Sequence, residues 1–186
     1  MQMTWSAYLQ NTKSLHPRKL LVEAVELVYD KDYALDLGCG ACNDAHFLLG
    51  AGFSVTAVDS NPESANYAAG LHFVKSSFED FLYEERKYDL INAQFALPFN
   101  APTTFDEVFE KITASLKPGG IFVGQFFGPE DEWAERDNMS FHSSSDIGNL
   151  LKPFEVLVLR EENSDGKLAS GGSKHWHIFH VIARKK

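Results

Sequence analysis

The stretch ALDLGCGACND, residues 34–44, decides which fold the chain can adopt and which chemistry it can carry. An apolar run leads into Gly38-x-Gly40, a pattern typical of a nucleotide-binding loop after the first strand of a parallel sheet. The same letters contain Cys39 and Cys42, a C-x-x-C spacing that also occurs in redox and metal sites. The rest of the sequence must favour one of these two interpretations.

Length, charge and hydropathy narrow the class of protein. A chain of 186 residues, 44% of them hydrophobic, suits one soluble domain at 1–186, in which 1–16 form an N-terminal cap helix. No apolar run is long enough to cross a bilayer, and the N-terminus has no signal pattern, so we expect a cytoplasmic protein that does not bind membranes. A net charge of −9 argues against a nucleic-acid partner, because phosphates attract a surplus of Lys and Arg. We expect a small-molecule partner and either a monomer or a homodimer.

Strand-like and helix-like segments alternate along the chain, which predicts an α/β fold with a doubly wound, mostly parallel sheet between two layers of helices. Segments 89–95 and 121–127 are apolar on both faces, as central parallel strands are. The polar, Gly/Ser-rich stretch 163–174 is expected to be a long hairpin loop that makes the last strand antiparallel. We expect seven strands in the order 3-2-1-4-5-7-6, at residues 33–38, 54–59, 72–75, 88–95, 121–127, 154–162 and 175–185.

Helix signals fill the gaps between these strands. Asn43 is interpreted as the cap of the helix that follows the glycine loop. Residues 103–107, TTFDE, have the form of a capping box that opens a helix running to Leu116. Shorter helices are expected at about 5–11, 17–28, 60–69, 78–84, 131–136 and 145–151.

The glycine loop and its surroundings indicate the kind of nucleotide. Asp59 ends the second strand 19 residues after Gly40, near the spacing of a carboxylate that holds ribose hydroxyls. A dinucleotide loop needs a third glycine, and that slot holds Asn43. Asp36, inside the first strand, would repel a pyrophosphate but can accept hydrogen bonds from an ammonium group. The expected ligand carries a ribose and a cation, which counts against a nicotinamide-dependent oxidoreductase.

The motifs DLGCGAC at 36–42 and TAVDSNPES at 56–64 resemble those of class I S-adenosylmethionine-dependent methyltransferases. The resemblance covers about residues 17–186 and includes KPGG before the fifth strand. It implies a Rossmann-like fold, S-adenosylmethionine as cofactor and S-adenosylhomocysteine as product. It also implies that Asp36, Gly38, Cys39 and Gly40 lie along the methionine part of the cofactor, and that Asp59 holds the ribose with Ser60 beside it. Ser77 and Phe78 match positions that flank the adenine, and Gln94 sits where a loop covers the cofactor.

Two positions depart from the family pattern. Cys42 stands where a third glycine is usual, and Ser77 stands where an acid is frequent. The segments AQFALPF, GQFFG and KHWHIFHVIARK are similar to those of tellurite-resistance-type bacterial methyltransferases. That resemblance suggests a soft oxyanion or chalcogenide acceptor, which Arg18 or Lys174 would help to hold, although a small organic acid, thiol or amine fits as well.

The C-x-x-C pair is better explained by the same loop. Cys39 lies between two loop glycines and has an acid three residues before it, whereas a redox thiolate needs an electropositive setting. A zinc site would recruit His46 but finds no third and fourth ligand at a suitable spacing. We interpret both cysteines as small residues in a tight turn and expect no metal.

The acceptor pocket must be built from loops at the carboxyl ends of the strands. The last hairpin should overhang it, and its alternation places His175, His177 and Phe179 on one face and Trp176, Ile178 and His180 on the other. No catalytic residue is assigned, because methyl transfer needs alignment more than a base. The candidates for the pocket, each of which is also explicable as packing, are Phe95, Pro98, Phe127, His142, His175 and Trp176.

The sequence thus favours an enzyme that methylates a small molecule. The alternative is a methyltransferase-like module without turnover, which holds the cofactor and assists a partner protein. A nicotinamide-dependent oxidoreductase is the third and least favoured reading.

Overall fold

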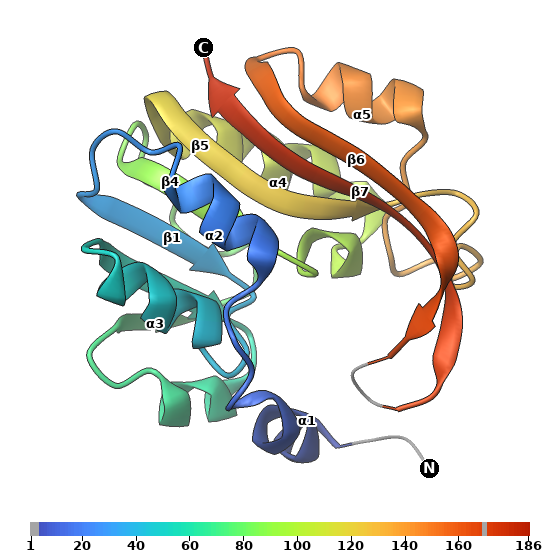
Figure 1. Cartoon of the computed structure of the whole chain (residues 1–186), viewed down its shortest axis with the longest axis horizontal. Coiled ribbons are helices and arrows are strands. Elements are labelled where there is room, and N and C mark those ends of the chain that lie inside the picture. The colour runs from blue at the N-terminus through green and yellow to red at the C-terminus, as the bar shows by residue number, and fades with distance from the viewer. Residues whose placement is uncertain (1–3, 169–170) are drawn as a thin grey trace.

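A computed structural model describes residues 4–168 and 171–186, and within them the strands form one seven-stranded sheet (Figure 1). The strand order is β3-β2-β1-β4-β5-β7-β6, as predicted. Neighbours from β3 to β5 pair in parallel, whereas β7 is antiparallel to both β5 and β6. The strands are β1 (Tyr33–Leu37), β2 (Ser54–Asp59), β3 (His72–Lys75), β4 (Tyr88–Ala93), β5 (Leu116–Phe127), β6 (Phe154–Lys167) and β7 (Ser173–Lys185).

Helices cover both faces of the sheet, and each face has its own apolar core. Neighbouring residues of β4 show the division, since Leu90 packs with α2 and α3 while Ile91 packs with α4 and α5. Such two-sided burial explains why the central strands are continuously apolar. The α-helices are α1 (Trp5–Thr12), α2 (Lys19–Val25), α3 (Asn43–Gly50), α4 (Pro102–Ser115) and α5 (Ser144–Leu150), joined by the short 3-10 helices η1 (Pro62–Tyr67) and η2 (Leu97–Phe99).

Several predicted helix features are wrong. Residues 78–84 and 131–136 form turns and not helices. Helix α4 starts at Pro102, which takes the first helical position, so the threonines of the expected capping box lie inside the first turn. The cap of α3 is Cys42, in the left-handed region at φ 58°, while the Asn43 amide donates to the Thr12 carbonyl at 2.8 Å and ties α1 to the loop.

The predicted hairpin loop at 163–174 is also wrong, because most of it is strand. The ladder between β6 and β7 continues from Phe154 opposite Lys185 to Lys167 opposite Ser173. The remaining tip contains residues 169 and 170, which lie outside the described part of the chain, as do residues 1–3 of the predicted cap helix. Since β5 ends opposite Ile178, the ribbon runs past the end of β5 and curves toward the side of α1 (Figure 1).

Candidate active site

The glycine loop between β1 and α3 is held by the neighbouring strand β2. The amides of Gly38 and Cys39 both donate to the Val58 carbonyl, at 2.8 and 3.0 Å, and the Gly40 amide donates to Oδ2 of Asp59 at 2.8 Å. Gly38 has φ +72°, and a Cβ added there would lie 2.7 Å from the Ala96 methyl group. Only glycine therefore fits at this point, with the loop after β4 resting directly on it.

Asp59 joins two loops at the carboxyl end of β2. Its Oδ2 holds the glycine loop, and its Oδ1 accepts the Asn61 amide at 2.8 Å. The side chain is buried, with 6% of the residue exposed. Each carboxylate oxygen can accept two hydrogen bonds, so the group keeps acceptor capacity for a ligand.

Asp36, at the end of β1, is a carboxylate with one open oxygen. Its Oδ1 accepts from the Asn92 amide at 2.7 Å, while its buried Oδ2 has no hydrogen-bond partner among the described residues. Burial, followed by the charge of Asp44, raises the pKa of Asp36 to about 7, and the bond from Asn92 opposes the rise. The raised pKa and the unpartnered Oδ2 indicate that Asn92 alone does not compensate the burial of this carboxylate.

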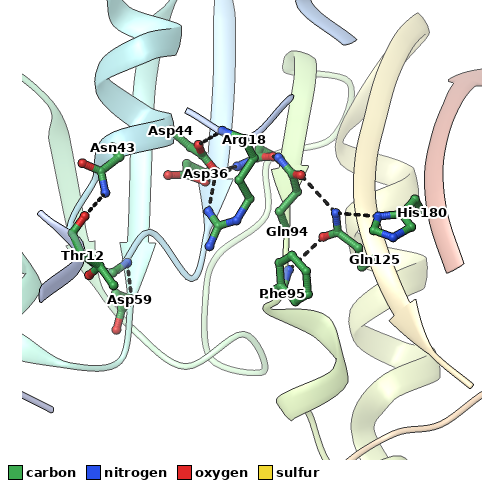
Figure 2. Close-up of polar contacts among 12 residues, drawn as sticks. Thr12, Arg18, Asp36, Asn43, Asp44, Asp59, Gln94, Phe95, Gln125 and His180 are labelled. Carbon is green, nitrogen blue, oxygen red and sulfur yellow. Dashed lines mark hydrogen bonds and ion pairs between the residues drawn. The ribbon is translucent and has the colours of Figure 1, made fainter. Parts of the chain in front are cut away.

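An ion pair fixes the start of α2 against α3. Arg18 donates to Asp44 through its backbone amide at 3.0 Å and through Nη1 at 2.6 Å, and only 3% of the Asp44 side chain is exposed. The Arg18 guanidinium lies 5.6 Å from the centre of the Phe95 ring (Figure 2). A cation thus stands among the buried acids Asp36 and Asp44.

A chain of side-chain amides crosses the carboxyl edge of the sheet. Asn92, which donates to Asp36, accepts a hydrogen bond from the Gln94 side-chain amide at 3.0 Å. Gln94 in turn accepts one from the Gln125 side-chain amide at 3.0 Å (Figure 2). The side-chain oxygen of Gln125 accepts a hydrogen bond from the Phe95 backbone N–H at 3.0 Å. Gln94, predicted to lie where a loop covers the cofactor, is therefore a buried member of this row of hydrogen-bonded amides.

The residues predicted beside ribose and adenine lie at the same edge. Ser60 is exposed directly after Asp59, and the Ser77 hydroxyl donates to Asp80 at 2.9 Å. Phe78 is half-buried, with its ring tip 3.5 Å from the Cβ position built on Gly38. The glycine loop thus meets an aromatic ring from the segment after β3.

Cys39 and Cys42 are buried free thiols whose sulfur atoms lie 3.6 Å apart. The hydrogen bond from Cys42, together with burial, raises the pKa of Cys39 and keeps it a thiol. The described residues hold no cluster of three His, Cys, Asp or Glu side chains that suits a metal ion.

Aromatic side chains gather beyond the end of β5. The rings of Phe95 and Trp176 lie 6.3 and 5.7 Å from the Phe127 ring, centre to centre. Half-exposed Phe99 lies 6.2 Å from the same ring, and Pro98 is buried beside it. Three of the predicted pocket residues are therefore neighbours in one cluster, which also contains Trp133, Met139, Phe141 and Ile178.

Two of the predicted pocket residues lie elsewhere. His175 is on the opposite face of β7 from Trp176, where its nitrogens contact Asp165 and Asn163 at 2.9 and 2.6 Å. The His142 ring lies 4.3 Å from the Phe105 ring, centre to centre and tilted by 47°, and lines a cavity of about 360 Å³ beside α4. Burial lowers the pKa of His142.

Lys174, which the sequence suggested as an anion holder, is buried and paired with Asp131. Its ammonium also lies 4.0 and 4.3 Å from the ring centres of Trp176 and Trp133. Burial lowers the pKa of Lys174, and the Asp131 carboxylate opposes that change. The ion pair ties residues 128–136 to the β6–β7 ribbon instead of facing a ligand.

Comparison with known proteins agrees with this geometry. Residues 34–120, which run from β1 to the start of β5, match the model of a methyltransferase domain. An uncharacterised methyltransferase of Synechocystis is 29% identical over 155 residues, which span 75% of this chain and 71% of that protein. The chain is therefore similar to S-adenosylmethionine-dependent methyltransferases, both in this matched region and in its fold.

Solved structures share the fold of this chain. TehB of Haemophilus influenzae superimposes with a TM-score of 0.80 at 16% identity, over 97% of this chain and 66% of its own. A 1,6-didemethyltoxoflavin-N1-methyltransferase of Burkholderia thailandensis gives 0.67 at 22% identity, over 90% of this chain and 79% of its own. In the part of the chain that the structure describes, no helix is both long and apolar enough to span a bilayer.

Sequence reasoning missed three polar residues of this candidate site, namely Asp44, Asn92 and Gln125. Each is almost fully buried and bonded to a residue far away in sequence. A signal was present for the two amides, because Asn92 and Gln125 interrupt strands that are otherwise apolar. Buried amides need partners, so their position within a core strand indicates a polar network.

Proposed function

We propose that this chain binds S-adenosylmethionine at the glycine loop and transfers its methyl group to a small-molecule acceptor in front of the aromatic cluster. The observation that carries the proposal is the open oxygen of Asp36 beside a loop that is itself held by Asp59. A second support is the named activity of the Burkholderia relative by fold, whose acceptor is a small molecule.

The residues present fit the cofactor. The α-ammonium group matches Oδ2 of Asp36, which is buried and unpartnered, and the ribose hydroxyls match the acceptor capacity left on Asp59. The Arg18 guanidinium has N–H groups beyond the one that meets Asp44, and a carboxylate suits them. Ser60 is proposed to lie beside the ribose, and Ser77 and Phe78 are proposed to flank the adenine.

When bound, S-adenosylmethionine supplies an activated methyl group on a sulfonium sulfur. The chain has to orient two molecules and keep water out, and such alignment can lower a barrier by about 7–11 kcal/mol in favourable cases. Phe95, Phe127 and Trp176 provide an apolar wall that excludes water from the acceptor side. We assign no general base, since His175 faces away from this wall and His142 packs against Phe105 beside α4.

The test has two stages. Calorimetry with S-adenosylhomocysteine should show binding by the wild type, because the contacts above all concern parts that this molecule shares with the cofactor. Methyl-labelled cofactor incubated with a small-molecule extract should then yield a labelled product of low mass. Absence of S-adenosylhomocysteine binding would refute the proposed site, and binding without any labelled small molecule would favour a module without turnover.

A further inference from the structure

The turn that follows β4 has an unusual backbone conformation. Phe95 has φ +52°, in the left-handed region that residues other than glycine rarely adopt. Its backbone N–H does not continue a strand ladder but donates to Oε1 of Gln125, a side chain with 1% of the residue exposed. A buried side-chain bond therefore holds the chain in a conformation that it does not prefer by itself.

This turn forms a wall that two parts of the site share. Ala96, the next residue, lies against Gly38 of the cofactor loop. The Phe95 ring belongs to the aromatic cluster and lies 6.2 Å from the Trp176 ring and 5.6 Å from the Arg18 guanidinium. A displacement of the turn would therefore disturb the glycine loop and the acceptor wall together.

The amides of this network can point in only one direction. At one end the Phe95 N–H must donate, so Gln125 presents its oxygen there and its nitrogen to Gln94. Gln94 in turn presents its nitrogen to Asn92, and Asn92 presents its nitrogen to the Asp36 carboxylate. Reversing one amide would set two donors or two acceptors against each other, and the buried partner would lose its bond.

We propose that Gln125 is a positioning residue for the transfer reaction. It sets the Phe95–Ala96 turn against the cofactor loop and links that turn, through Gln94 and Asn92, to Asp36. This role rests on the proposed function, because the turn matters for transfer only if the glycine loop holds the cofactor. Gln125 itself touches neither the glycine loop nor the aromatic cluster through any contact described above, so its effect passes through Phe95.

Three variants separate this role from ordinary packing. Gln125→Met keeps the volume and removes the hydrogen bonds to Phe95 and Gln94, together with the 3.5 Å contact to Nδ1 of His180. Gln125→Glu keeps an oxygen acceptor for the Phe95 N–H in either protonation state. Val123→Ala is the matched control, because Val123 is buried in β5 two residues earlier, on the same side of the strand, outside the network.

Amide hydrogen exchange and calorimetry with S-adenosylhomocysteine provide the two readouts. In Gln125→Met the Phe95 amide should exchange at least about tenfold faster while the Leu90 and Ile91 amides are unchanged. The dissociation constant should rise at least about tenfold, which corresponds to 1.4 kcal/mol. Gln125→Glu should keep the Phe95 amide protected, and the Val123 control should change the affinity less than about twofold.

Each result supports or overturns the role. If Gln125→Met binds S-adenosylhomocysteine as well as the Val123 control does, Gln125 does not position the site. If Gln125→Glu loses Phe95 protection as completely as Gln125→Met, the hydrogen bond is not the cause, and the proposal is also overturned. Failure of the wild type to bind would instead overturn the proposed function, so the two failures are distinguishable.

Discussion

Replacing Asp36 by asparagine should make the free protein more stable above neutral pH. The reason is burial, since 2% of the residue is exposed and the desolvated carboxylate, repelled by Asp44, has a pKa of about 7 instead of the ordinary 3.8. The folded state therefore holds a proton that the unfolded state releases at about pH 4. Stability from this group is fully present below that pH and is lost as the pH rises toward 7.

The size of the effect follows from the two pKa values. Between pH 5 and pH 8 the wild type loses about 2–3 kcal/mol of unfolding free energy through Asp36, at 1.36 kcal/mol for each unit between pH 5 and the folded pKa. Asn cannot ionise but keeps an oxygen for Asn92, so Asp36→Asn should not show this loss. The stability of the variant relative to the wild type should therefore increase by about this amount between pH 5 and pH 8.

Urea unfolding at both pH values, followed by circular dichroism, measures the difference directly. Asp30→Asn, at an exposed position, is the control and should follow the pH profile of the wild type. The same Asp36 substitution should weaken S-adenosylhomocysteine binding at pH 8, because it removes the anionic acceptor proposed for the ammonium group. A stability difference between variant and wild type that is the same at pH 5 and pH 8 would refute the reasoning about Asp36.

Three further substitutions test the site and its supports. Asp59→Ala should weaken S-adenosylhomocysteine binding at least about tenfold in calorimetry with an unchanged circular dichroism spectrum, since charge-assisted bonds are worth about 1.5–3 kcal/mol; equal affinity would show that the ribose is not there. Gly38→Ala should destabilise by about 1–3 kcal/mol in urea unfolding, because of its φ of +72° and a methyl group 2.7 Å away, whereas Gly148→Ala, with open space around it, should not. Lys174→Met should lower the free energy of unfolding in urea by about 3–5 kcal/mol, because it leaves Asp131 buried without its cation. A decrease of less than about 1 kcal/mol would contradict a tight ion pair.

The fold was predictable because its main signals are local. A strand with two apolar faces must lie inside the sheet, and Leu90 and Ile91 do pack into opposite cores. The glycine loop follows β1 and Asp59 ends β2, and these two strands are neighbours joined through one helix. Their spacing in the sequence alone therefore places the loop and the acid together. The antiparallel end of the sheet followed in the same way from two strand patterns joined by a polar segment.

The rest depended on contacts that no local pattern encodes. Asn92 meets Asp36 across 56 residues, and Gln125 meets Gln94 across 31. Strand ends were misjudged as well, because the backbone ladder of β6 and β7 continues through a Gly/Ser-rich sequence that has little strand preference of its own. Trp176 and His175 alternate as expected, but only the positions of Phe95 and Phe127 reveal which of the two faces the aromatic cluster.

The start of α3 bears on the choice between a dinucleotide and S-adenosylmethionine. A pyrophosphate normally binds at a helix N-terminus that follows the glycine loop, where free backbone N–H groups and the helix dipole favour a negative charge. Here the first turn of α3 contains the buried carboxylate of Asp44, and its cation is already provided by Arg18. Asp36 adds a second acid to the same region, so a phosphate would meet two carboxylates before it met the helix. An ammonium group meets the opposite situation, since the open oxygen of Asp36 is the contact that it requires.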